Sequence, residues 1–302
     1  MYNGILLLRK PQTFTSHDAV AKLRGIFHQR RIGHAGTLDP MAEGLLVVLL
    51  GNATCASDWA AGQDKEYVTR LRLGTVTDTQ DITGRVLETR PVHVTESALQ
   101  ETLRAFTGTL RQTPPMYSAV QVNGERLYKL ARKGVEISRE SREIRVTELV
   151  RLPQESGIAE NDFDLRIVCS KGTYVRTLCH DIGAALGCGG CMAALIRTRC
   201  GVFTLDQAYS FAELEEKGPA LEACLLPTDA VFSELPAITV NATGAIRARN
   251  GAFLSQEHLT AGEVPEEGML CRVYADGTFV WLGESRTLDK GGTAVFCGVS
   301  FF

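Results

Sequence analysis

Six consecutive apolar residues, Leu45–Leu50, place the strongest constraint on how this chain can fold. A strand that is apolar at every position carries hydrophobic side chains on both faces, so it has to lie inside a sheet that is covered on both sides. A glycine-rich octapeptide, Gly33–Pro40, precedes the run and contains a single carboxylate, Asp39. The sequence therefore predicts a buried strand with a reactive acid in the loop before it.

Size and composition limit the class of protein. A chain of 302 residues with 44% hydrophobic residues can form one large domain or two modest domains with a buried core. No apolar run approaches the length of a membrane span, and Ile5–Leu8, followed by Arg9 and Lys10, is too short for a signal peptide. The nine cysteines are typical of free thiols in a reducing compartment. We therefore expect a cytoplasmic protein that does not bind a membrane.

One pair of cysteines is close enough in sequence to suggest a metal. Cys188 and Cys191 have the spacing of half a zinc site or of a redox pair. No second Cys-x-x-Cys pair and no pair of histidines accompanies them. The alternative is that both thiols pack in the core, and on that interpretation no metal is expected.

The net charge of −3 conceals a division along the chain. Residues 1–204 hold 26 Lys and Arg against 21 Asp and Glu, whereas residues 205–302 hold 6 against 14. Two basic clusters, residues 22–31 and 126–145, have the charge to follow a phosphate backbone, although each is also compatible with a solvated helix face. The candidate phosphate contacts of the first cluster are Lys22, Arg30 and Arg31.

Both helical and alternating patterns occur before residue 205. Residues 67–73 alternate, with Tyr67 on the apolar face and Arg70 and Arg72 on the other. Strands are predicted at 5–8, 45–50, 67–73 and 163–169, and helices after a cap at Thr15 or Ser16, over 95–106 and from Val175 to a stop at Gly187. Few helices among hairpin-like strands favour an α+β fold with a mixed, largely antiparallel sheet.

The pattern changes near Leu235. Short strands are predicted at 238–240, 269–273, 278–281 and 294–301, with a hairpin turn at Asp276 and Gly277. We therefore expect two domains, residues 1–234 and a small β-rich domain at residues 235–302.

Asp39 has three interpretations on local grounds. Asp followed by Pro is a common helix start, with the carboxylate as the cap. A short helix there would also place Glu43 on the same face as Asp39, which is the carboxylate pair of a glycosidase. The third interpretation is a single catalytic acid beside a basic surface.

Five motifs in order give the third interpretation its weight. Gly33–Pro40 resembles the catalytic motif of the TruB family of tRNA pseudouridine synthases. The other stretches that resemble family motifs are 7–16, 65–74, 114–119 and 172–178. The resemblance spans the first two thirds of the chain and implies a sheet with a central cleft, and the segment after Leu235 resembles the PUA-like domain of bacterial members.

The resemblance implies an isomerase. Its expected reaction is conversion of the T-loop uridine of tRNA, at tRNA position 55, to pseudouridine after the base is flipped out of the loop. Asp39 would be the catalytic acid, acting as a nucleophile at C1′ or C6 or as a base at C2′. No cofactor and no metal are expected. The expected partner is the T-arm of tRNA, with no obligatory protein partner, and the expected state is a monomer.

The resemblance also assigns roles to single residues, each beside a structural alternative. Tyr67 would stack on the flipped base, although a tyrosine on such a strand is commonly a core residue. Arg176 would pair with Asp39 and touch phosphate, although it lies off the apolar stripe of its helix, as a surface arginine does. His34 would fill the gap that the flipped base leaves in the RNA stack, although it is also an ordinary loop histidine. The remaining expected substrate contacts are Lys65 at the cleft or its rim, Tyr174 at the pocket floor and Leu195 in the pocket wall.

Two positions depart from the family pattern, and two other functions stay open. Cys55 stands where members usually carry lysine, and Cys191 where many carry histidine or another polar residue. One alternative function is a tRNA-binding or tRNA-folding chaperone without turnover. The other is a guide-RNA-dependent synthase related to dyskerin, which needs protein partners.

Overall fold

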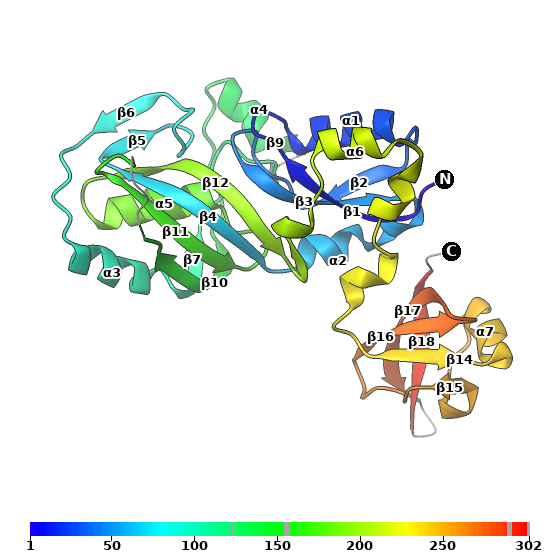
Figure 1. Cartoon of the computed structure of the whole chain (residues 1–302). Helices are drawn as coiled ribbons and strands as arrows, with labels where there is room; N and C mark the ends of the chain where they lie inside the picture. Colours follow the sequence, from blue (N-terminus) through cyan, green and yellow to red (C-terminus); the bar gives the residue numbers. More distant parts are fainter. Residues whose placement is uncertain (123, 154–157, 289–291, 301–302) are drawn as a thin grey trace.

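The computed structural model describes residues 1–122, 124–153, 158–288 and 292–300. A large sheet with helices packed against it forms most of the molecule, and a small β-rich unit follows it (Figure 1). The expected α+β class, with a mixed and largely antiparallel main sheet, is confirmed. None of the helices in these residues combines the length and the apolar character that crossing a bilayer requires.

Among the described residues the main sheet has nine strands. Its central path runs β1 (Gly4–Lys10), β3 (Glu43–Leu50), β12 (Gly190–Cys200), β4 (Lys65–Leu73), β11 (Asp162–Cys169), β10 (Arg142–Arg151) and β7 (Gly108–Gln112). β2 (Ile32–Ala35) pairs with β3, and β13 (Phe203–Thr204) pairs with β12. β3 and β12 are parallel, and the other neighbours on this path are antiparallel.

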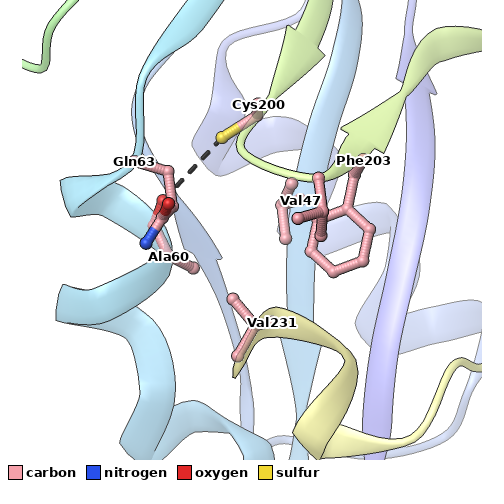
Figure 2. A pocket seen from close by; sticks show the side chains of 7 residues that line it. Val47, Ala60, Gln63, Cys200, Phe203 and Val231 are labelled. Atoms are coloured by element: carbon pink, nitrogen blue, oxygen red, sulfur yellow. Dashed lines mark hydrogen bonds between the residues drawn. The ribbon is translucent and has the colours of Figure 1, made fainter. Parts of the chain in front are cut away.

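The apolar run lies in β3, as predicted, and it is buried on both faces. Leu46, Val48 and Leu50 enter one core, which also contains Tyr67 and the buried faces of the helices α1 (Ser16–Ile26) and α5 (Val175–Ala185). The alternate residues Leu45, Val47 and Leu49 enter a second core on the opposite face. Figure 2 shows a hollow in this second core, beside Val47, Cys200 and Phe203, which has no room for a water molecule. It therefore lies across the sheet from Tyr67.

The three predicted helices are present. α1 (Ser16–Ile26) begins after Thr15, whose side chain forms a capping box with Asp18, and α3 (Glu96–Ala105) is capped by Thr95. α5 (Val175–Ala185) is followed by Gly187 at φ 77°, a conformation that favours glycine. The sequence did not indicate three groups of short elements. The first are the shorter helices α2 (Ser57–Gly62), α4 (Leu127–Arg132), α6 (Phe211–Lys217) and α7 (Ala242–Arg249), and the second are the 3₁₀ turns η1 (Gly51–Ala56), η2 (Leu205–Gln207), η3 (Gly218–Cys224), η4 (Thr228–Phe232) and η5 (Gln256–His258). The third are two small ribbons, β5 (Thr75–Thr77) with β6 (Val86–Thr89) and β8 (Gln121–Val122) with β9 (Glu125–Arg126).

The C-terminal unit has its own sheet and its own core. Within the described residues its strand order is β15 (Leu259–Ala261), β14 (Ala237–Val240), β16 (Leu270–Ala275), β17 (Thr278–Thr287) and β18 (Thr293–Ser300). Asp276 and Gly277 form the predicted hairpin turn, both with positive φ, 50° and 74°. The strand expected over 294–301 is β18, and residue 301 lies outside the described residues.

The segment before this unit packs on the main sheet. Phe211 and Leu214 of α6 join the first core, and Phe232 of η4 joins the second. The ring of Phe232 stands 5.4 Å from Trp59 and 5.8 Å from Phe279 of the C-terminal unit, so aromatic packing connects the two parts. The packing of α6 and η4 in the cores of the main sheet supports the division that we propose between residues 234 and 235.

α5 rests directly on β12 through glycines. A Cβ added to Gly183 of α5 would lie 2.2 Å from the backbone nitrogen of Gly190 and 2.4 Å from the carbonyl carbon of Gly189. Both contacts are with backbone atoms, which cannot move aside as the flexible end of a side chain can. The helix that carries Arg176 is therefore placed by close backbone contact.

We expect Gly183→Ala to destabilise the protein by about 2 kcal/mol or more, because the added methyl group forces α5 away from β12. The matched control is Gly25→Ala in α1, where an added Cβ meets nothing within 4 Å. That control should stabilise the protein by up to about 1 kcal/mol, the usual gain from alanine in a helix. Urea unfolding of both variants tests the prediction, and equal effects at the two positions would contradict it.

Candidate active site

Asp39 lies in the loop that joins β2 to β3. The structure places no helix there: Pro40 and Met41 form a turn, the Ala42 amide donates to the Asp39 carbonyl at 3.1 Å, and β3 begins at Glu43. The interpretation of Asp39 as a helix cap is therefore wrong. The helix that would have brought Glu43 onto the same face as Asp39 is not formed, so the glycosidase pair loses its support.

Hydrogen bonds from α1 and its approach hold this loop. The Ser16 hydroxyl accepts from the Leu38 amide at 2.9 Å and lies 3.2 Å from the Leu38 carbonyl. The amide of Thr13 donates to the Pro40 carbonyl at 2.7 Å. The residues on both sides of Asp39 are thus attached to the segment that begins α1, which leaves the carboxylate little freedom to move.

Arg176 holds the carboxylate of Asp39 with two hydrogen bonds. Its Nε donates to Oδ2 at 2.9 Å and its Nη2 to Oδ1 at 3.1 Å. The Arg176 side chain is 6% exposed, whereas that of Asp39 is 34% exposed. A planar guanidinium that binds both oxygens fixes the orientation of the carboxylate. Asp39 is therefore oriented from the protein side and open to solvent on the other.

The remaining donors of Arg176 are also engaged by the protein. Nη1 donates to the Thr79 carbonyl at 3.1 Å, and Nη2 donates to the Tyr117 carbonyl at 2.9 Å. Nη1 also lies 3.8 Å from a carboxylate oxygen of the buried Asp81. The interpretation of Arg176 as a surface residue is wrong, because two carboxylates and two carbonyls satisfy its charge in the interior. These partners leave no support for the phosphate contact that the resemblance implied.

Tyr67 and Leu195 lie in the first core, on neighbouring strands. Tyr67 is 8% exposed and Leu195 is 5% exposed. Burial raises the pKa of the Tyr67 phenol to about 12, and the guanidinium of Arg197 opposes this rise. Tyr67 is therefore neutral at physiological pH. Its burial agrees with the core interpretation, and its stacking on a flipped base stays a prediction.

Tyr174 stands at the start of α5, two residues before Arg176. Gln112, at the end of β7, binds both backbone groups of Tyr174: its Nε2 donates to the carbonyl at 3.1 Å and its Oε1 accepts from the amide at 2.8 Å. Burial raises the pKa of the Tyr174 phenol. Gln112 therefore ties the start of the arginine-bearing helix to the edge of the sheet.

His34 lies on β2, paired with Val48 of β3, and so belongs to a strand and not to a loop. Its ring faces that of His17 edge-on, with centroids 6.4 Å apart. Burial lowers the pKa of His34, and the charge of His17 adds to this effect. The Nδ1 atom is buried and has no hydrogen-bond partner among the described residues. His34 is therefore a mainly neutral flat ring at the edge of the loop that carries Asp39.

Two of the expected substrate contacts are committed to protein partners. Lys65 is 5% exposed, and its Nζ donates to the carbonyls of Ala61 and Gln63. Lys22 forms an ion pair of 3.0 Å with Glu215 of α6 and lies over the ring of Phe211. The structure gives no support to Lys65 as a residue of the rim, and Lys22 reaches a substrate only by giving up Glu215.

Arg30 and Arg31 are exposed, as a phosphate contact requires. The side chain of Arg31 is spread over the surface by neighbours in η1: Nη1 donates to the Asn52 side chain at 2.8 Å, Nε donates to the Thr54 hydroxyl at 3.1 Å, and Nη2 lies 3.6 Å from the Cys55 sulfur. The position where family members usually carry lysine thus lies beside an arginine in this chain.

Lys10 is a buried cation near the site. Its Nζ donates to the carbonyls of Pro11 at 2.8 Å and Phe14 at 2.7 Å, and its side chain is fully buried. Burial lowers the pKa of Lys10 to about 8, although the charge of Asp39 favours the protonated form. Lys10 therefore contributes to a positive environment behind the carboxylate.

Sequence reasoning missed four polar residues that support the site. They are Lys10, Asp81, Gln112 and Arg197, all buried. Lys10 lies within the motif at residues 7–16, and Gln112 lies just before the motif at residues 114–119. This proximity to a motif was the one feature of the sequence that could have identified them. Asp81, Gln112 and Arg197 contact residues distant in sequence, which no local pattern reveals.

Cys188 and Cys191 are both buried. In the described part of the chain no three His, Cys, Asp or Glu side chains lie close enough together to hold a metal ion. Their burial agrees with packing residues, and the absence of zinc stays a prediction.

Two family models match the chain. The model of the TruB family pseudouridylate synthase N-terminal domain matches residues 24–175, and the model of the tRNA pseudouridylate synthase B C-terminal domain matches residues 176–233. The second match ends just before the boundary that we propose at 234.

Named relatives match most of the chain. The tRNA pseudouridine synthase B of Heliobacterium modesticaldum is 46% identical over 290 residues, which are 95% of this chain and 92% of that protein. The protein of the same name from Bacillus cereus is 42% identical over 84% of this chain and 85% of its own length. The fold is also that of a solved Cbf5-Nop10-Gar1 complex, with a TM-score of 0.76, 26% identity, and coverage of 100% of this chain and 85% of that one.

We expect Gln112→Leu to lower the free energy of unfolding by about 2 kcal/mol, because the Tyr174 amide loses its acceptor, while the Tyr174 carbonyl keeps the Leu178 amide as a donor. Gln112→Glu keeps an acceptor for the amide and should lose less. The control is Gln121→Leu, at an exposed position of β8. Urea unfolding ranks the variants, and a Gln112→Leu protein as stable as the control would contradict the role of Gln112.

We expect the stability of the wild type to rise between pH 8 and 10.5 relative to Lys10→Met. In this window the unfolded chain still holds the lysine proton while the folded protein has released it, so deprotonation favours folding. The gain is about 1.4 kcal/mol per unit of pKa difference between the two states. Urea unfolding of both proteins at pH 7.5 and pH 10 measures it, and parallel pH dependence in the two proteins would refute the prediction.

Proposed function

Because the chain belongs to the TruB family of pseudouridine synthases, we propose that it converts a uridine of tRNA to pseudouridine, and that the target is the T-loop uridine at tRNA position 55. The observation that carries the proposal is a carboxylate open to solvent on one side and bound on the other by a buried guanidinium, Asp39 with Arg176. This pair joins two of the five motifs.

The reaction rearranges one nucleotide and consumes nothing. The bond between N1 and C1′ breaks, a bond between C5 and C1′ forms, and the proton on C5 is replaced by one on N1. Asp39 can serve as the nucleophile at C1′ or at C6, or as the base at C2′. All three routes need an oriented carboxylate, which Arg176 provides.

The other residues of the site suit a flipped base. Tyr67 offers a flat neutral ring, and Leu195 offers apolar surface on the adjacent strand. A base that leaves its stack loses a few kcal/mol of stacking, and His34 recovers part of this loss by taking its place. Single-stranded loops release bases most readily, which supports the T-loop as the target.

The proposed RNA surface extends from the site across basic side chains. Arg30 and Arg31 are exposed at the end of the β2–β3 pair that lies away from the Asp39 loop, where the Arg31 carbonyl accepts from the Gly51 amide, and Arg126, Lys129 and Arg132 are exposed on β9 and α4. Contacts with phosphates should make affinity fall as salt rises. The acidic segment after residue 204 adds little to this attraction, so the N-terminal unit supplies most of the affinity on this proposal.

The proposal places the enzyme in the cytoplasm as a monomer, with tRNA as its partner and no obligatory protein partner. All nine cysteines are free, in agreement with a reducing compartment. The match of 46% over nearly the full length of a tRNA pseudouridine synthase B, against 26% to a chain solved with Nop10 and Gar1, favours the stand-alone enzyme over the guide-dependent alternative. Retention of Asp39 and Arg176 as an ion pair disfavours a chaperone without turnover, since binding alone does not require it.

We expect Asp39→Asn to abolish pseudouridine formation on an unmodified tRNA transcript while leaving tRNA affinity within a few fold, because the amide keeps the shape of the side chain and loses its charge. The control is Asp276→Asn in the hairpin turn of the C-terminal unit, where asparagine suits positive φ. Mapping pseudouridine in the product tests both reaction and position. Substantial turnover by Asp39→Asn would refute the role of Asp39, and a wild type without activity on tRNA would refute the function.

A further inference from the structure

A second arginine lies near the site and is more deeply buried than Arg176. Arg197 of β12 is 1% exposed. Its Nε donates to the Leu45 carbonyl at 2.7 Å, and its Nη2 donates to the Gly36 carbonyl at 3.2 Å. Within the described residues it forms no ion pair. A buried cation without a carboxylate partner is costly, so its presence calls for an explanation beyond packing.

The two carbonyls that Arg197 binds stand at the two stems of the Asp39 loop. Gly36 follows β2, and Leu45 lies in β3 two residues after its start. β12 meets β3 in parallel at this point, and a Cβ added to Gly44 would lie 2.4 Å from the Arg197 carbonyl oxygen. Arg197 therefore spans the base of the loop and holds its two ends.

The same guanidinium reaches Tyr67. Arg197 and Tyr67 are direct neighbours across β12 and β4, and the guanidinium lies within hydrogen-bonding reach of the phenol. Guanidinium has donors and no acceptor, so the phenol oxygen of Tyr67 must accept. The phenol proton is then left to point elsewhere, and the ring is tied to a fixed neighbour.

We propose that Arg197 is a positioning residue that links the hydroxyl of Tyr67 to the Asp39 loop and so sets the two groups in register for the reaction. The proposal rests on the proposed function and adds a residue to it. Arg197 lies beneath the loop, touches Asp39 by no hydrogen bond in the described structure, and acts through Tyr67 and the loop backbone.

The electrostatic surroundings agree with this role. Burial lowers the pKa of Lys10, Lys65 and His34, and the nearby charge of Arg197 adds to this effect for each of them. An apolar residue at this position would leave the carbonyls of Leu45 and Gly36 without these donors. The guanidinium is therefore kept for the contacts that it makes at the two ends of the Asp39 loop.

The test is a double-mutant cycle with single-turnover kinetics on unmodified tRNA transcript. We expect Arg197→Met to lower the rate constant about tenfold with the tRNA dissociation constant within about twofold of wild type, because the link between Tyr67 and the loop is lost. In the Tyr67→Phe background, where the link is already broken, the same substitution should change the rate less than about twofold. Equal effects of Arg197→Met in both backgrounds would overturn the proposal.

Two further variants separate positioning from folding. Arg197→Lys keeps the charge, so it should fold as the wild type does. Its ammonium cannot reach three acceptors, so its rate should lie between those of wild type and Arg197→Met. Arg199→Met, two residues along the same strand, is the control and should keep the wild-type rate; Arg199 donates to the Gly201 carbonyl.

The outcomes distinguish the two proposals. A wild type without activity defeats the proposed function. If wild type and Arg199→Met are active and both Arg197 variants turn over at the wild-type rate, the inference about Arg197 is overturned and the proposed function stands. Loss of rate that follows only the loss of folded protein, measured by circular dichroism and thermal unfolding, also overturns it.

Discussion

The ion pair between Asp39 and Arg176 is the interaction on which the rest of the structure depends. It joins a loop near the start of the chain to a helix 137 residues later. A bidentate pair of this kind works only if both side chains arrive in one plane, so each backbone has to be held on its own account. The Ser16 and Thr13 contacts hold the loop, and the glycine contact between α5 and β12 holds the helix. Gln112 secures the start of that helix through Tyr174.

The main sheet makes these supports compatible with one another. β3 is buried on both faces, so the strand that leaves the Asp39 loop cannot shift without disturbing two cores. Its parallel neighbour β12 supplies Leu195 and Arg197, and β4 on the other side of β12 supplies Tyr67. Adjacent strands thus present their side chains to one core face beside the loop. A reactive carboxylate can stand on a loop here because the loop is short and both of its ends are fixed.

Charge is distributed unevenly at the site and along the chain. Two buried arginines and a buried lysine surround the region of Asp39, while Asp81 is the buried carboxylate that shares Arg176 with it. Burying cations is unfavourable unless carbonyls or carboxylates replace water, and in each case backbone carbonyls do so. The net charge of −3 does not reveal this positive environment, because the acidic residues of 205–302 outweigh the excess of Lys and Arg in residues 1–204. The local field, and not the total charge, is what a polyanionic substrate meets.

Sequence alone determined the features that depend on short periods and local chemistry. The alternation of β4 placed Tyr67 on the buried face, the apolar run defined β3, and Thr15 and Thr95 marked the starts of their helices. The motifs identified Asp39, and their order identified the family. Tertiary structure decided what the polar side chains do. Arg176, off the apolar stripe of its helix, is buried because carboxylates from two distant loops meet it there, whereas Lys65 bonds to nearby carbonyls and Lys22 to Glu215. A hydrophobic period repeats within one element and is visible in sequence, but the partner of a charge lies on another element, at a distance that only the folded chain sets.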